Sequence, residues 1–260
     1  MAGRSGGQSL AANAWSKVPL VTLTFWIVKI LATTVGETGG DALSMTLDLG
    51  YLVSTVIFLG FFAVTLTTQL LSRRYHPVFY WLVVVATTTL GTTTSDYMDR
   101  TLGLGYIKSS IALSIGVIVV LAIWHFAAGR IEFQNVVTRR DEFFYWLTIL
   151  VANTLGTALG DFTASDTGLG FERGALVFAG LIAVVAALHF FTRLPKSVLF
   201  WAAYVLTRPL GATLGDTLTK PHADGGLQFG RITSTLVMAA AMVVILAITS
   251  REKPATGASA

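Results

Sequence analysis

Four aspartates, each at a fixed distance from a tryptophan and a glycine, have the type and spacing that best suit ion chemistry in this sequence. Each follows a tryptophan by fifteen residues and a glycine by five, and the segments GETGGD, GTTTSD, GTALGD and GATLGD end at Asp41, Asp96, Asp161 and Asp216. Carboxylate oxygens are the ligands that hard cations such as Mg²⁺, Ca²⁺ and Mn²⁺ prefer. We therefore expect these aspartates to bind a metal cation, together with Glu37, which follows the glycine in the first segment only.

The aspartates also have a structural alternative. An aspartate at the membrane interface can cap the next helical turn, and DALS and DYMD are suitable cap sequences. Two observations favour the ion site. The spacing to glycine never varies, whereas capping positions in loops tolerate shifts. A carboxylate at a helix C-terminus also faces the unfavourable end of the helix dipole, which a cation would relieve.

Two basic residues, Lys29 and Arg208, fall inside apolar segments. Because a charge in hydrocarbon is costly, we expect each to pair with an acid, either Glu37 or one of the four aspartates. The alternative is that they line an anion site. Five acids against these two bases leave a formal charge of −3, which favours a cation.

Small residues recur four positions apart within the same motif. Residues with this spacing share one helix face, and small ones allow two helices to approach closely in lipid. We expect helix packing for Gly36, Gly40, Gly91, Ser95, Gly156, Gly160, Gly211 and Gly215. A helix break that exposes carbonyl oxygens to an ion is the functional alternative. The four tryptophans are expected to anchor the helices at the membrane interface.

Other chemistry finds little support. His125 and His189 take matching places in their repeats, and we expect core or interface roles for them, with a proton relay as the alternative. There is no cysteine, which excludes disulfides and disfavours soft metals. Phosphate-binding loops, dinucleotide fingerprints and nucleophile elbows are absent. The sequence thus predicts neither an enzyme nor a resident cofactor, and its net charge of +4 lacks the aromatic-interleaved basic surface of a nucleic-acid-binding protein.

The elements that must position these residues are long apolar helices. Hydrophobic residues make up 53% of the 260 residues, charged residues 12%, and mean hydropathy is +0.69. Apolar blocks of about 20 residues match the thickness of the hydrocarbon core. We expect an all-α membrane protein with the lipid bilayer as its partner and helices at 18–38, 51–71, 77–94, 106–128, 143–159, 171–191, 197–214 and 231–249.

The fixed spacing divides the chain into four two-helix repeats. They are expected at 18–72, 73–137, 138–192 and 193–250, between tails at 1–17 and 251–260. Because each repeat has an even number of helices, all four take the same orientation, which predicts pseudo-fourfold or paired pseudo-twofold symmetry about the membrane normal. The four aspartates would then lie at similar depth.

Loop charges predict the orientation. The tails and the loops between repeats hold eleven basic residues against four acids, and the loops within repeats hold ten acids against five bases. The positive-inside rule therefore places both termini in the cytoplasm and the aspartates at the outer side.

The Trp-to-G-x-x-x-[GS]-D repeat, in four two-helix copies, resembles an uncharacterised bacterial membrane-protein family. That family is defined by four tandem repeats of unknown function, each with two transmembrane segments and a tryptophan. The resemblance covers the chain from about 19 to 249. It implies a multi-pass protein of the bacterial inner membrane and supplies no activity.

Three functions stay open at this point. The leading hypothesis is a secondary transporter, favoured as an exporter, that moves a hard inorganic cation such as Mn²⁺ in exchange for protons. The second is a channel-like pore with the aspartates as its selectivity ring. The third is an intramembrane enzyme, or a scaffold that binds a lipid or a partner. The sequence leaves the oligomeric state open.

Overall fold

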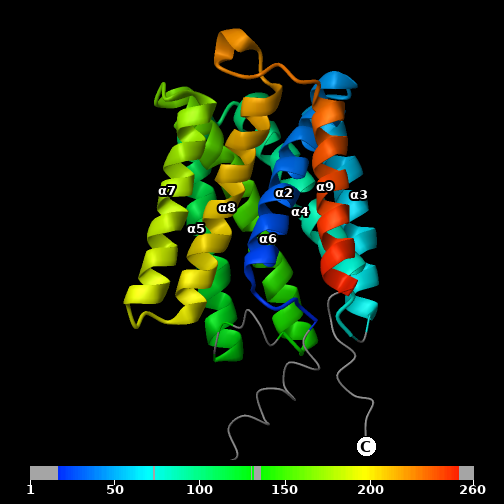
Figure 1. Cartoon of the computed structure of the whole chain (residues 1–260), viewed down its shortest axis with the longest axis vertical. Coiled ribbons are helices and arrows are strands. Elements are labelled where there is room, and N and C mark those ends of the chain that lie inside the picture. Colours follow the sequence, from blue (N-terminus) through cyan, green and yellow to red (C-terminus); the bar gives the residue numbers. More distant parts are fainter. Residues whose placement is uncertain (1–16, 73, 130, 132–135, 252–260) are drawn as a thin grey trace, which may run out of the picture.

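The computed structural model describes residues 17–251 apart from 73, 130 and 132–135, so the expected tails fall almost wholly outside it. Within this range the fold is all-α, without strands, and eight long helices run side by side (Figure 1). They are α2 (Leu23–Asp41), α3 (Gly50–Leu71), α4 (Pro77–Asp96), α5 (Tyr106–Ala128), α6 (Arg139–Asp161), α7 (Gly170–Phe191), α8 (Lys196–Thr219) and α9 (Arg231–Arg251). Each predicted helix has its counterpart, so the expected fold class is confirmed.

The helices form an inner and an outer ring. The first helices of the four repeats, α2, α4, α6 and α8, contact one another in cyclic order and enclose the centre. Each outer helix packs mainly on the inner helix of the following repeat: α3 on α4, α5 on α6 and α7 on α8. The last helix, α9, packs on α2 and so closes the ring beside it (Figure 1).

The two rings differ in composition. By length and composition, five helical segments could cross a membrane: α3, α5, α7, α9, and α6 with the turn that follows it. Only 11 to 17% of the most apolar window of each outer helix is buried, so these helices present their apolar side chains outward. The inner helices α2, α4 and α8 are richer in Thr, Gly and charged residues. These polar residues are compatible with a membrane because the outer helices and the other inner helices separate them from lipid.

Glycines set the close spacing of the inner ring. A Cβ added at the glycine of each motif would lie only 2.1–3.0 Å from an atom of the next inner helix. The atom always belongs to the residue three positions before that helix's own glycine: Gly36 faces Thr88, Gly91 faces Asn153, Gly156 faces Arg208 and Gly211 faces Thr33. The second small residues continue this contact, since Gly40 faces Thr92, Gly160 faces Ala212 and Gly215 faces Glu37.

The two ends of the bundle differ in character. We call the end where the inner helices reach their aspartates the acidic end, and the opposite end, with the connections between repeats, the basic end. At the basic end Trp81, Trp146 and Trp201 are at most 6% exposed. They contact Tyr80 and Tyr145 edge-to-face and Tyr204 in a tilted arrangement. The expectation that the tryptophans anchor the interface is therefore wrong for these three, which pack inside the bundle.

Turns after the aspartates carry the chain to the outer helices. π-helical turns follow the first three inner helices directly, at Ala42–Thr46, Tyr97–Thr101 and Phe162–Asp166. A residue with positive φ then precedes the aromatic residue near the start of each outer helix. It is glycine in three repeats, and in the fourth it is Gln228, with φ of 57°. The recurrent Gly-Tyr or Gly-Phe pair thus meets a backbone requirement.

Candidate functional site

The four aspartates lie at the acidic end and are buried. Each is at most 2% exposed, although each carries a carboxyl group. Asp41, Asp96 and Asp161 precede the π-helical turns, yet none of their side chains makes a capping hydrogen bond there. The capping alternative is therefore wrong for these three. What lies near the carboxylates is a set of basic side chains.

Two bases bridge the aspartates in pairs across neighbouring repeats. Arg100 Nε lies 3.2 Å from Asp96 Oδ1, and its Nη2 lies 3.3 Å from Asp161 Oδ2. Lys220 Nζ lies 3.2 Å from Asp216 Oδ1 and 3.5 Å from Asp41 Oδ2. Each base follows its own aspartate by four residues and reaches the aspartate of the next repeat in the ring.

Aromatic residues of the outer helices flank both bridging bases. Arg100 donates to the Tyr51 hydroxyl at 2.9 Å, and Lys220 lies 5.7 Å from the centre of the Phe171 ring. Tyr51 belongs to repeat 1 and Phe171 to repeat 3, while the two bases come from repeats 2 and 4. Tyr106 of repeat 2 also interacts with Arg100. The acidic end has paired twofold character within a fourfold ring of helices.

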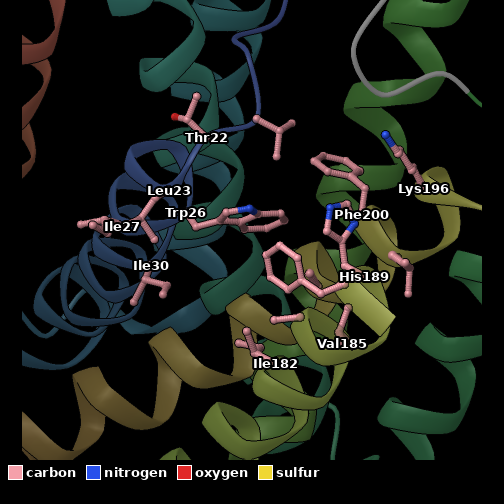
Figure 2. A pocket seen from close by; sticks show the side chains of 15 residues that line it. Thr22, Leu23, Trp26, Ile27, Ile30, Ile182, Val185, His189, Lys196 and Phe200 are labelled. Carbon is pink, nitrogen blue, oxygen red and sulfur yellow. The ribbon is translucent and has the colours of Figure 1, made fainter. Parts of the chain in front are cut away.

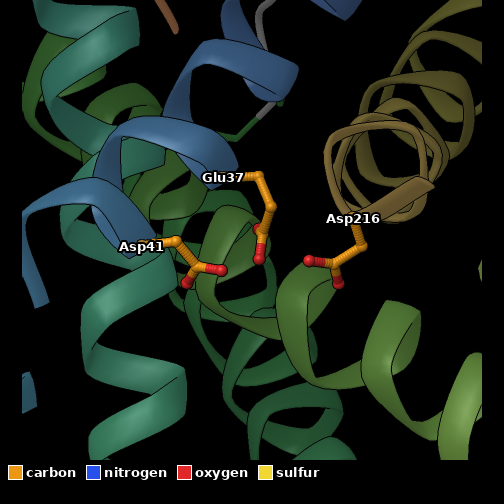
Figure 3. Close-up of side chains that lie close together, drawn as sticks. All are labelled: Glu37, Asp41 and Asp216. Carbon is orange, nitrogen blue, oxygen red and sulfur yellow. The ribbon is translucent and has the colours of Figure 1, made fainter. Parts of the chain in front are cut away.

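One of the two pairs has a third carboxylate. Glu37, from α2, lies beside Asp41 and Asp216, and one carboxylate oxygen from each of the three lies within 4.8 Å of the others. Figure 3 shows the three groups pointing toward one another from α2 and α8. Asp41 Oδ2 and Asp216 Oδ1 accept no well-directed hydrogen bond from the described residues, and their contacts with Lys220 and Arg231 are ion pairs. We call Glu37, Asp41 and Asp216 the carboxylate triad.

A buried arginine fixes the inner side of the carboxylate triad. Arg208 is fully buried, and its Nη2 donates to Glu37 Oε2 at 2.9 Å. The same nitrogen contacts the hydroxyls of Thr92 and Thr157 at 2.5 and 2.6 Å. Glu37, Thr92 and Thr157 occupy the same position in three repeats, directly after the motif glycine. Arg208 therefore holds three inner helices together around one guanidinium.

Two partly exposed basic side chains close the outer side of the carboxylate triad. Lys220 bridges Asp41 and Asp216, and Arg231 Nε lies 3.5 Å from Asp41 Oδ2. The side chains of Lys220 and Arg231 are 13% and 25% exposed, so both reach solvent. Burial alone would lower the pKa of Lys220, but the carboxylates of Asp216 and Asp41 outweigh it and hold that pKa above its usual value.

Lys29 does not pair with an acid as expected. It is fully buried, and its Nζ has no hydrogen-bond partner in the described part of the chain. The side-chain nitrogen instead lies 4.3 Å from the centre of the Tyr204 ring. The reason is distance along the helix: Lys29 precedes Glu37 by eight residues, or about 12 Å of helical rise.

The histidines do not lie near the carboxylates either. His125 and His189 are exposed residues of the outer helices α5 and α7, near the basic end. The described residues place neither of them in the interior of the bundle, so the structure does not support the proton relay. The matching residue of repeat 1, Gln69, is fully buried and donates to the carbonyl of Lys17 at 3.3 Å.

Sequence reasoning missed three members of the site: Arg100, Lys220 and Arg231. Predicted helix ends at 94 and 214 place Arg100 and Lys220 in loops, and Arg231 stands at the very start of the predicted last helix. A signal was available, since Arg100 and Lys220 each stand four residues after a motif aspartate, one helical turn away.

These observations define an all-α membrane protein whose four two-helix repeats surround a buried charged site. The family model for the Repeat of Unknown Function (DUF347) matches residues 24–75, 79–130, 144–194 and 199–254, one segment in each repeat. The chain therefore belongs to this family. It has no significant match among functionally curated proteins or among solved structures.

Proposed function

We propose that this protein is a secondary transporter of a hard divalent cation, such as Mn²⁺, which binds between α2 and α8 at the carboxylate triad. The observation that carries the proposal is the convergence of Glu37, Asp41 and Asp216 in a buried place. Their oxygens suit Mg²⁺, Ca²⁺ or Mn²⁺ better than soft metals.

The spacing of the carboxylate triad fits one ion. Oxygens on opposite sides of an ion with bonds of 2.3–2.6 Å lie about 4.6–5.2 Å apart, and neighbouring ligands lie closer. The three oxygens of Glu37, Asp41 and Asp216 all lie within 4.8 Å of one another. A calcium-sized ion therefore needs only small side-chain movements to bind all three, and a smaller ion such as Mn²⁺ would draw the oxygens closer together.

The fixed charges favour a divalent ion. The carboxylate triad contributes −3, and Arg208, which is fully buried and contacts Glu37, contributes +1. The sum of −3 and +1 is −2, which one divalent cation neutralises. A monovalent cation would leave a buried negative charge, and buried unpaired charges are costly.

Lys220 and Arg231 take the place of the ion in the structure. Both lie within 3.5 Å of the carboxylate triad and both extend from the solvent side. Their two positive charges equal the charge of one divalent ion. We infer that the ion displaces these side chains when it binds, and that they return when it leaves.

A transporter accounts for the interior better than an open pore. The buried guanidinium of Arg208 links the inner helices beside the carboxylate triad, and its charge opposes passage of a free cation. Nearer the basic end, Lys29 lies against the ring of Tyr204, and Tyr80 and Tyr145 pack against motif tryptophans. Movement of an ion therefore requires the inner helices to rearrange, as in alternating access.

The proposal extends to location and coupling. The basic loops between repeats favour a bacterial inner membrane with both termini in the cytoplasm, so that the carboxylate triad opens to the outer side. Neighbouring carboxylates can exchange a metal ion for protons, which supports export of the metal against proton entry.

Mn²⁺ flux in proteoliposomes tests the proposal. We expect the purified protein to move Mn²⁺ at a rate that depends on an imposed pH gradient. Glu37→Gln removes one ligand with little change of shape and should lower the rate at least about tenfold. Glu172→Gln makes the same chemical change at an exposed position of α7 and should leave the rate unchanged.

The outcomes separate the candidates. Flux that ignores the pH gradient would identify a pore instead. Absence of both Mn²⁺ flux and Mn²⁺ binding in folded wild-type protein would refute the cation site. If Glu37→Gln does not fold, because Arg208 loses its partner, Asp216→Asn serves the same purpose, since Asp216 does not contact Arg208.

A further inference from the structure

A groove opens in the side of the bundle, in the half nearer the basic end, between α2, α7 and α8 (Figure 2). Its volume is about 700 Å³, which falls in the range of cavities that hold small organic molecules. Its walls are mainly aliphatic and aromatic, with Ile27, Ile30, Ile182, Val185 and Phe200 among them. It lies far from the carboxylate triad and plays no part in the proposed transport site.

A difference between repeats explains why the groove is open. On α5, Trp124 is fully buried and lies 6.0 Å, ring to ring, from Trp201 of α8. The matching residue of α7, at the same distance from the motif tryptophan of its repeat, is His189, which is smaller than tryptophan and is exposed. The space beside the corresponding tryptophan of α2, Trp26, stays unfilled, and Trp26 is only half-buried. The groove is thus a specific feature of the junction between repeats 4 and 1.

The rim of the groove carries positive charge and hydrogen-bond donors. Lys196 and His189 line it on one side, and Figure 2 shows both near Phe200. Two helices also begin at the rim, α8 at Lys196 and α2 at Leu23. Helix N-termini carry partial positive charge, so they add to the field of Lys196.

We propose that the groove binds one anionic phospholipid, with an acyl chain along its apolar walls and the phosphate at Lys196. The groove and the lipid match chemically: the apolar walls suit an acyl chain, and the basic rim suits the negatively charged head group. The outer helices present apolar surface to hydrocarbon on both sides of the groove, so a lipid enters it without leaving the bilayer.

A second copy of the chain is a less suitable occupant. A symmetric dimer about this groove brings the same surface of both copies together. Lys196 of one copy would then approach Lys196 of the other, and like charges in an apolar contact are unfavourable. A lipid phosphate supplies the opposite charge at the same place.

Native mass spectrometry of the full-length protein in detergent tests the inference, with dioleoylphosphatidylglycerol as the anionic probe and dioleoylphosphatidylcholine as the neutral one. We expect one phosphatidylglycerol to bind about tenfold more tightly than phosphatidylcholine. Ala186→Trp fills the groove and should abolish this tight binding. Ala187→Trp adds the same bulk at the neighbouring exposed residue, which does not line the groove, and should have no effect.

Two charge-reversal variants provide a second, matched test of lipid binding. Lys196→Glu should weaken phosphatidylglycerol binding about five- to tenfold, whereas Arg193→Glu, an equal charge change outside the groove, should change it less than twofold. Equal binding of the two lipids, or equal effects of the two tryptophan variants, would overturn the inference. A dimer that Ala186→Trp disrupts would overturn it in favour of a second copy. These measurements use no metal, so their outcome does not depend on whether the protein transports a cation.

Discussion

Removal of the ammonium that bridges Asp41 and Asp216 should strengthen metal binding. Lys220 supplies one of the two partly exposed positive charges, with Arg231, that lie against the carboxylate triad in the structure. Because its pKa is raised, Lys220 stays protonated at neutral pH and competes with any incoming cation. The variant Lys220→Met keeps the length of the side chain and removes that competitor. We therefore expect a higher affinity for Mn²⁺ in this variant, even though it loses the ion pairs of Lys220 with Asp41 and Asp216.

The geometry sets the size of the effect. A pair of unit charges 3.2 Å apart, the distance from Lys220 to Asp216, interacts by about 5 kcal/mol at an effective dielectric constant of 20 and by about 1.3 kcal/mol in water. Lys220 is partly solvated, and the net value of such contacts falls near the lower figure. A gain of about 1–2 kcal/mol corresponds to an affinity for Mn²⁺ about five- to thirtyfold higher.

Isothermal titration of purified protein with Mn²⁺ at fixed pH and ionic strength measures this change. Arg100→Met is the matched control, since Arg100 bridges Asp96 and Asp161 in the same way. That pair lacks a third carboxylate, so its variant should leave Mn²⁺ affinity within about twofold of wild type. An unchanged or lower affinity in Lys220→Met, or an equal gain in Arg100→Met, would mean that the carboxylates form structural ion pairs and nothing more.

Two further predictions concern stability, measured as thermal unfolding in detergent. Gly211→Ala places a Cβ 2.1 Å from Thr33 Oγ1, so it should lower the free energy of unfolding by about 2–3 kcal/mol, whereas Gly60→Ala, with open space around it, should not lower it. Lys29→Met removes a fully buried amino group that has no hydrogen-bond partner among the described residues and should raise the melting temperature. A lower melting temperature would show that the contact with Tyr204 outweighs the cost of burying the amino group.

The repeat pattern was sufficient to predict the architecture. Apolar blocks of membrane length and the constant spacing from Trp26 to Gly36 to Asp41 predicted eight helices in four equivalent units, and the fold class and family agree. The spacing of residues within one repeat does not predict which of the other repeats that repeat contacts. The contact between Gly36 and Thr88, and the packing of each outer helix on the next repeat, depend on the direction of the ring, which only the tertiary structure fixes.

The site was only partly predictable. The sequence indicated an acidic cluster but overestimated its negative charge, because Arg100 and Lys220 lie just past the expected ends of their helices. The error for Lys29 had a different cause: its charge suggested an acidic partner, but helical rise places it two turns from Glu37. The tryptophans show a third limit, since composition alone does not distinguish a ring at the lipid interface from one packed between inner helices.

The order of the helices has a consequence for biosynthesis. The first inner helix, α2, holds Lys29, Glu37 and Asp41 and is not among the segments apolar enough to cross a membrane unaided. Its outer cover, α9, leaves the ribosome only after the six helices α3 to α8, which lie between α2 and α9 in the chain. During synthesis the charged helix α2 therefore stays without this cover until α9 has been made.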